Sequence, residues 1–333
     1  MDFHAEFFPR PFPVKLNHRH KLMLVGSCFT EQIGNKLALH KFSVVENPNG
    51  ILFNPVSISH AVRSYVQGKL YSVDELFYSN ELWGSWQHHT RFSSIDKQVS
   101  LERINDSQKK ASAFIKEADW LLLTLGSAFI YEDRAIENNG NYENVVANCH
   151  KVPADKFNRR LLSAEEVKDI LQQMIQEVKK QNPGVNFIYT ISPVRHLREG
   201  FIENNRSKAT LIQAVHALTN DVDIFYFPAY ELVIDDLRDY RFYAEDMAHP
   251  NYAATNYVWE KFINACIDEP SQQLMKEIAI VTAAFNHKPF NPESEQHRKF
   301  LDQNLARIKA ITEKYPYIDF AAENYYFKTG TRA

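Results

Sequence analysis

The chain has 333 residues, with 38 basic and 41 acidic side chains and a formal net charge of −3. This near balance argues against a dedicated nucleic-acid binder and against a basic protein of membrane surfaces. The first 20 residues hold no apolar core of signal-peptide length, and no run approaches the length of a transmembrane helix. We therefore expect a cytoplasmic protein that binds neither nucleic acid nor a membrane.

Three cysteines, Cys28, Cys149 and Cys266, are scattered along the chain. Their number and spacing fit neither a disulfide framework nor a zinc site, and an odd count is typical of a reducing compartment. We expect no bound metal. The 23 Phe, 16 Tyr and 4 Trp residues favour a well-packed core and ring-lined pockets, including pockets that stack on sugars.

Short apolar or aromatic runs predict five β-strands, and amphipathic patterns between them predict helices. The strands are expected at residues 21–25, 42–45, 120–125, 185–191 and 223–227. The helices are expected at residues 30–40, 57–67, 101–118, 164–181, 207–220 and 252–267. Ser163 is the expected N-cap of the fourth helix, and Asn182 its stop. The alternation predicts parallel βαβ units, and hence a three-layer α/β/α sandwich around a five-stranded parallel sheet.

Two stretches exceed a minimal fold of this kind, residues 70–94 and residues 136–156. Both are expected as long loops over the C-terminal edge of the sheet, where open α/β folds bind ligands. After Pro270 the pattern is helical again, at residues 272–285 and 293–315. We therefore divide the chain into a main domain, residues 1–268, and a helical extension, residues 269–333, which packs on it or mediates oligomerisation. The sequence does not set the oligomeric state.

The first strand ends in Gly26, Ser27 and Cys28. Glycine allows a sharp turn off the strand, and the next helix begins near Cys28. Amides at a helix N-terminus lower the pKa of a thiol and can hold an oxyanion. Ordinary roles are also open, because Ser27 is a good helix N-cap and Cys28 could be a small buried apolar side chain.

Asp246 and His249 follow the fifth strand and precede the helix at residues 252–267. A carboxylate three residues before an imidazole can orient the ring and fix its tautomer. The position of the pair predicts that it faces the same sheet edge as Cys28. A nucleophile followed far downstream by its base indicates acyl-transfer chemistry.

Several strings of this sequence resemble the signature of the GSCFA family, which belongs to the wider group of SGNH (GDSL-like) hydrolases. They are Gly26-Ser27-Cys28-Phe29-Thr30, Leu125-Gly126-Ser127, Asn148-Cys149-His150-Lys151, Ser192-Pro193-Val194-Arg195-His196, Tyr226-Phe227-Pro228-Ala229-Tyr230-Glu231 and the segment from Arg241 to Pro250. The resemblance covers roughly residues 20–265. It implies a flavodoxin-like α/β/α sandwich, and ester hydrolysis or O-acyl transfer, often on carbohydrates, without a cofactor.

The resemblance also implies roles for particular residues. Asp246 and His249 match the Asp-x-x-His block of the superfamily directly. In the nucleophile block, Cys28 takes the place of the serine when no gap is introduced, whereas a shift of one residue gives that place to Ser27. Either side chain is therefore a candidate nucleophile, with His249 as its general base and Asp246 orienting the imidazole.

The oxyanion block of the superfamily, Gly-x-Asn, is only partly present. Gly126 and Ser127 match its start, but Ala128 replaces the asparagine that would hold the oxyanion. Replacement donors are expected from backbone amides around the nucleophile, from the Gly50 amide and from the Asn54 side chain. The missing asparagine also supports a non-catalytic binding module that has kept the fold.

Polar residues after the fourth strand and in the second long loop complete the candidate pocket. Arg195 is expected either to hold a carboxylate or phosphate of the substrate or to form a buried ion pair with Glu231 or Asp235. His196 and His150 are expected as substrate-binding residues that line the pocket.

Other charged and imidazole side chains receive no catalytic role. Arg198, Arg206 and Lys208 are expected in solvent, and His88 and His89 are expected to face solvent or a pocket, because no metal-ligand spacing is present.

The resulting expectation is an ester hydrolase that deacylates an acylated carbohydrate or another small ester. The alternatives are an O-acyltransferase that uses a coenzyme A ester as acyl donor, and the non-catalytic ligand-binding module. No other cofactor is expected.

Overall fold

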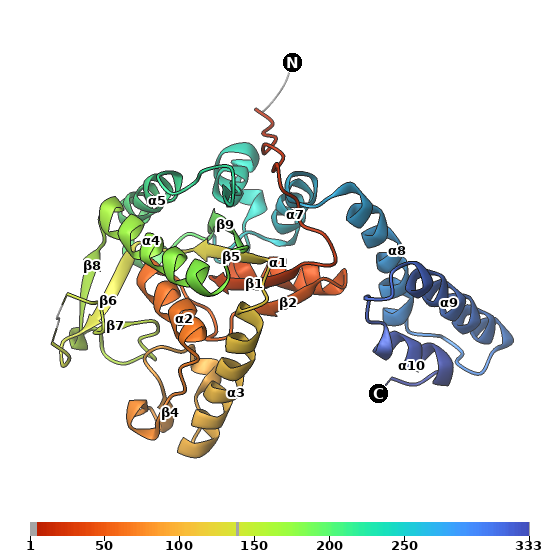
Figure 1. Cartoon of the computed structure of the whole chain (residues 1–333), viewed down its shortest axis with the longest axis horizontal. Helices are drawn as coiled ribbons and strands as arrows, with labels where there is room; N and C mark the ends of the chain where they lie inside the picture. The colour runs from red at the N-terminus through yellow and green to blue at the C-terminus, as the bar shows by residue number, and fades with distance from the viewer. Residues whose placement is uncertain (1–4, 138–139, 333) are drawn as a thin grey trace.

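The computed structural model describes residues 5–137 and 140–332. Its centre is a parallel sheet in the order β10-β9-β5-β1-β2 (Figure 1). Its strands are β1 (Lys21–Gly26), β2 (Ser43–Glu46), β5 (Trp120–Leu125), β9 (Asn186–Ile191) and β10 (Ile224–Tyr226). Counted along the chain, the sheet strands lie in the order 2-1-3-4-5, the flavodoxin-like arrangement. The predicted strands and the parallel sheet are confirmed.

Helices cover both faces of this sheet, because strand residues alternate between two apolar clusters. Leu22 and Leu24 pack with α1 and α7, whereas Met23 and Val25 pack with the other main-domain helices. The first layer is α1 (Cys28–Leu39) and α7 (Tyr252–Cys266), and the second is α2 (Pro55–Gln67), α3 (Lys97–Ile115), α4 (Ala164–Gln181) and α5 (Phe201–His216). The three-layer prediction is therefore confirmed. In the described part of the chain, no helix combines the length and apolar character needed to cross a bilayer.

The expected caps of α4 are present. The Ser163 hydroxyl accepts a hydrogen bond from the Glu166 amide, and the Glu166 carboxylate accepts one from the Ser163 amide, which makes a capping box. Asn182 ends the helix.

The two expected loops contain regular structure that the sequence pattern did not indicate. Residues 70–94 form the hairpin of β3 (Phe77–Ser79) and β4 (Leu82–Gly84), flanked by η1 (Val73–Glu75) and η2 (Thr90–Phe92). A second, antiparallel sheet consists of β6 (Phe129–Asp133), β7 (Val145–Val146) and β8 (Phe157–Leu161), in the order β7-β6-β8. Short elements complete the chain: η3 (Ala154–Lys156), η4 (Leu197–Glu199), α6 (Ala229–Glu231), the π-helix η5 (Leu232–Leu237) and η6 (Tyr240–Phe242).

The C-terminal helices α8 (Glu269–Asn286), α9 (Glu295–Lys314) and α10 (Ala321–Thr329) share an apolar core of their own. They form a group at one end of the molecule, opposite the β6-β7-β8 sheet (Figure 1). Met275 of α8 joins the α1–α7 core, and Lys41 forms a partly buried ion pair with Glu323 at 2.6 Å. These contacts join α8 and α10 to the rest of the chain, and the division into a main domain and a helical extension stays a prediction.

Gly26 fixes the turn at the end of β1. Its amide donates to the Asn47 side chain at 2.8 Å, its carbonyl accepts from the Leu52 amide at 2.9 Å, and its φ is +152°. A methyl group here would overlap the backbone carbonyl of Thr124 on β5.

We therefore expect Gly26→Ala to lower the free energy of unfolding by about 3 kcal/mol or more, measured by urea denaturation. Gly184→Ala is the matched control, because nothing lies within 4 Å of the methyl group that it would add. Equal stability of the two variants would contradict this account of the turn.

Candidate active site

The C-terminal edge of the parallel sheet gathers the predicted site residues. Ser27 and Cys28 follow β1, Ser127 follows β5 shortly after its end, and Arg195 follows β9. The Arg195 amide donates to the Ala248 carbonyl at 3.0 Å. This bond attaches the turn that carries Asp246 and His249 to the same edge.

The Asp246 carboxylate makes three hydrogen bonds, one of them with the imidazole of His249. One carboxylate oxygen accepts from the amides of Ala248 and His249, both at 3.0 Å, and the other contacts Nδ1 of the ring at 2.6 Å. The two amides and then the ring lower the pKa of Asp246 to about 2. A carboxylate on Nδ1 keeps the proton on that nitrogen, which leaves Nε2 as the basic atom.

Ser27 and Cys28 differ in solvent exposure and in the hydrogen bonds of their side chains. Ser27 is 1% exposed, and its hydroxyl caps α1 by accepting from the Phe29 amide at 3.3 Å. Cys28 is half-buried and is not in a disulfide. The geometry therefore gives Ser27 a structural role in the turn and leaves the thiol of Cys28 as the more accessible candidate nucleophile.

The surroundings of Cys28 keep its thiol protonated at neutral pH. Burial raises the pKa of the thiol, and this effect outweighs the opposing hydrogen bonds from the amides of Phe29 and Cys28 and the positive charge of Lys208. A thiol of this kind needs a general base to become nucleophilic. Nε2 of His249 is the candidate for that general base.

The prediction that Lys208 lies in solvent is wrong. Its side chain is 1% exposed, and its ammonium donates to the carbonyl oxygens of Gly126 at 2.7 Å and Ser192 at 2.6 Å. These carbonyls lie just beyond β5 and β9, so the side chain joins the two strand ends. The signal was available in the pattern, because Lys208 lies on the same helical face as the buried Leu211 and Val215.

His196 is close enough to Lys208 and to His249 for their charges to act on it. Burial lowers the pKa of His196 to about 3, and Lys208 and His249 act in the same direction. The ring is therefore neutral and is not a second base at neutral pH. A methyl group on Gly126 would lie 3.2 Å from His196 Nε2, which is closer than most such contacts, so the small size of glycine lets the ring pack against this position.

The predicted oxyanion donors are not equally free. The Gly126 and Ser127 amides both donate to the Phe53 carbonyl, at 2.8 and 3.0 Å, and the Gly50 amide donates to the Asn47 carbonyl at 2.7 Å. These three amides are engaged in holding the loops together. They do not favour the oxyanion role that the sequence suggested for Gly50.

Asn54 follows the loop after β2 and caps α2. Its side-chain oxygen accepts from the Ser57 amide at 2.8 Å, which leaves the side-chain nitrogen as its remaining donor group. The side chain is 4% exposed and lines a cavity. The Phe29 and Thr30 amides of α1 donate to Ser27, so the Asn54 side chain and the Cys28 amide are the candidate donors for an oxyanion.

Arg195 does not form the buried ion pair that the sequence suggested as one alternative. Its guanidinium lies over the rings of Tyr243, at 4.2 Å, and Tyr240, at 5.1 Å. Among the side chains that the structure describes, no carboxylate forms an ion pair with it, and Glu231 instead accepts from the Tyr226 hydroxyl at 2.8 Å. The alternative, an anion of the substrate, stays a prediction.

A cavity of about 520 Å³ opens beside this edge, between the sheet and β6-β7-β8. Asn54, Ser127 and His196 line it next to the strand ends, and His150 lies farther along its wall. Neither Cys28 nor His249 is part of the lining. His150 is 9% exposed, and its Nε2 is bonded to the Ser85 carbonyl at 2.9 Å, so this ring fastens the wall to the β3-β4 hairpin.

The sequence model of the GSCFA family matches residues 21–262. The chain belongs to the GSCFA family. A second model, GSCFA domain protein, C-terminal domain, matches residues 278–333, which include most of α8 and all of α9 and α10.

Comparison of this GSCFA chain with the curated proteins gives no significant match. A carbohydrate esterase family 3 structure from Talaromyces cellulolyticus is 11% identical, with a TM-score of 0.36, over 78% of this chain and 99% of that chain. A mutant acetyl esterase with an acetate ion is 12% identical, with the same TM-score and coverage. At these TM-scores, neither likeness informs the activity of the GSCFA chain.

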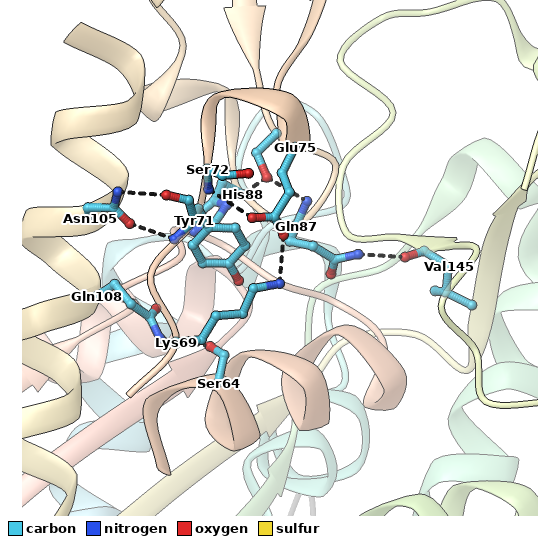
Figure 2. Close-up of polar contacts among 11 residues, drawn as sticks. Ser64, Lys69, Tyr71, Ser72, Glu75, Gln87, His88, Asn105, Gln108 and Val145 are labelled. Carbon is cyan, nitrogen blue, oxygen red and sulfur yellow. Dashed lines mark hydrogen bonds and ion pairs between the residues drawn. The ribbon is translucent and has the colours of Figure 1, made fainter. Parts of the chain in front are cut away.

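The inserted segment of the GSCFA chain, residues 70–94, is anchored on two sides (Figure 2). The backbone of Tyr71 exchanges hydrogen bonds with the Asn105 side chain of α3, at 2.8 and 3.0 Å, and the Gln87 side chain donates to the Val145 carbonyl of β7 at 3.1 Å. The segment is thus held in place on two sides and is not a free loop.

His88 lies inside this segment, which corrects the expectation that it faces solvent or a pocket. Its ring is 1% exposed and packs edge-on against Tyr71 and Phe92. Burial lowers its pKa to about 3. Among the residues that the structure describes, no three His, Cys, Asp or Glu side chains are grouped as a metal site.

Proposed function

We propose that this GSCFA protein is an acyl-ester hydrolase that uses Cys28 as nucleophile and no cofactor. The observation that carries the proposal is the Asp246–His249 pair, which is attached to the sheet edge where Cys28 begins α1. A carboxylate-oriented imidazole and a half-buried thiol are the parts of a nucleophile–base site, as in the SGNH pattern that the sequence resembles.

The reaction follows from the protonation states of these groups. His249 Nε2 takes the proton of the Cys28 thiol as the sulfur attacks the ester carbonyl, and the Cys28 amide and the Asn54 side chain stabilise the oxyanion. The carbon–oxygen bond of the ester then breaks, and His249 returns the proton to the leaving alcohol. Water, activated by His249, attacks the thioester, which releases the carboxylic acid and restores the thiol.

Acyl transfer from a coenzyme A ester is the second candidate function, and the thiol favours it. Exchange between a thioester donor and Cys28 conserves the thioester bond, so the acyl-enzyme forms without a large change in bond energy. An alcohol acceptor then takes the place of water in the second step.

The test is to incubate the protein with p-nitrophenyl acetate and, separately, with acetyl-coenzyme A, and to follow product release and intact mass. We expect nitrophenolate release and transient addition of one acetyl group to the peptide that contains Cys28. Labelling by acetyl-coenzyme A with turnover only after an alcohol is added would favour the transferase. If neither donor acylated the protein or turned over, the proposal would fail in favour of a non-catalytic binding module.

A further inference from the structure

We propose that the 520 Å³ cavity binds the alcohol part of the ester, and that it selects sugars that carry a carboxylate or phosphate group. The assignment of an ester as ligand rests on the proposed function. The preference for an anion rests on other residues, which lie outside the Cys28–His249–Asp246 group.

The walls of the cavity suit a sugar ring. Phe53, Phe129, Tyr131 and Phe157 line it, so aromatic faces are available on several sides. Polar side chains such as Asn148 interrupt these rings and can bond hydroxyl groups. Aromatic and apolar walls that carry polar groups are usual in small-molecule sites.

The charged side chains that line the cavity are positive. Lys151 and Arg198 both line it, and no Asp or Glu is part of the lining formed by the described residues. Burial raises the pKa of Cys149, and Arg198 acts in the opposite direction, which places the guanidinium near that thiol in the same wall. Two cations without a carboxylate beside them favour an anionic ligand, although the chain as a whole is slightly acidic.

The backbone that carries Lys151 is strained. His150 and Lys151 have φ of 49° and 59°, two consecutive left-handed residues where glycine would be the relaxed choice. Hydrogen bonds hold the turn in place, from the His150 amide to the Asn148 side chain and from the Val152 amide to the Cys149 carbonyl, both at 2.8 Å. Strain that the surroundings enforce is typical of functional loops, and here it places a lysine at the cavity.

The cavity also leads to the proposed catalytic residues. His196 lines its inner part and is close enough to His249 for their charges to interact. Asn54, a proposed oxyanion donor, lines the same part. The ester group of a bound sugar is therefore proposed to lie on the side of the cavity that His196 lines, toward His249.

The test compares three acetyl esters on the same enzyme: O-acetyl glucuronate, O-acetyl glucose 6-phosphate and O-acetyl glucose. We expect kcat/KM for at least one anionic ester to exceed that for the neutral ester by about tenfold at low ionic strength, mainly through KM. A preference for only one anionic ester would identify the anion as carboxylate or phosphate. Equal kcat/KM for all three esters would overturn the inference while leaving the hydrolase intact.

The K151Q/R198Q variant should lose this preference, because kcat/KM for the anionic esters should fall about tenfold, to the value for O-acetyl glucose measured with the same variant. K116Q removes an exposed charge after α3, away from the cavity, and should behave like the wild type. Lys151→Gly separates binding from folding, because it removes the charge and relieves the left-handed backbone. A K151Q/R198Q variant that keeps the preference would overturn the inference.

Binding without turnover distinguishes failure of this inference from failure of the proposed function. Glucuronate and glucose 6-phosphate are titrated into the Cys28→Ala variant by calorimetry, with glucose as the neutral control. Saturable binding of an anionic sugar that K151Q/R198Q removes would support the anion site even if no ester were hydrolysed. Absence of anion binding, with or without hydrolysis of the neutral ester, would overturn it.

Discussion

Cys28→Ala should reduce ester turnover by about 10⁴-fold or more and abolish acetylation of the protein, whereas Ser27→Ala should keep both. The thiol of Cys28 is half-buried and lies at the N-terminus of α1, while the Ser27 hydroxyl is buried and bonded to the Phe29 amide. The measurement is nitrophenolate release, together with the mass of the trapped acyl-enzyme.

Ser27→Ala still has a structural effect, which serves as its signature. Loss of the N-cap hydrogen bond should lower the free energy of unfolding by about 1 kcal/mol, with turnover per folded molecule retained. Cys28→Ser provides an intermediate, because an alcohol with the same shape is less readily deprotonated. Labelling that survives Cys28→Ala and disappears in Ser27→Ala would reverse the assignment of the nucleophile.

His249→Ala and Asp246→Asn should both strongly reduce ester turnover. Turnover of the double variant should be only slightly lower than that of His249→Ala alone. Asp246 acts on the substrate only through the imidazole that it orients at 2.6 Å, so the two losses are not additive. We expect turnover to fall about 10²–10⁴-fold in Asp246→Asn and at least as much in His249→Ala. H287Q, which removes an exposed imidazole at the end of α8, is the control.

The pH dependence of these variants follows from the shifted groups. The pKa of Asp246 is about 2, below its ordinary value, so its charge is present at neutral pH and is lost only as the pH falls toward 2. The pKa of Cys28 is raised by burial, so residual turnover of His249→Ala should increase with pH by about tenfold per unit until the thiol ionises without help. A flat residual profile would mean that Cys28 is not the attacking group.

The parallel sheet was predictable because its central strands are buried on both faces. Residues 120–125, for example, are apolar apart from Thr124, and every one of them is buried. The short antiparallel strands carry no such signal, since β8 reads Phe-Asn-Arg-Arg-Leu and exposes its centre. Pairing with β6, and not composition, makes that segment a strand.

The sequence indicated which residue types form the site, but it left their roles open. Ser27 and Cys28 are neighbours with similar chemistry. Their roles can be distinguished only in the structure, where Ser27 caps α1. Lys208 was wrongly predicted to lie in solvent, because the prediction relied on its charge and not on its position on an apolar helix face. The engagement of the Gly50 amide depends on a turn that the sequence pattern does not specify.

The hydrogen bonds of Lys208 and Arg195 connect three separate chain segments into one stiff rim. Lys208 ties the end of β5 to the residues after β9, and the Arg195 amide ties those residues to the turn with His249. A ligand that displaced any one of these segments would have to pull the other two with it. A shift at this edge should therefore move these segments together, and the Asp246–His249 turn should stay aligned with the ends of β5 and β9.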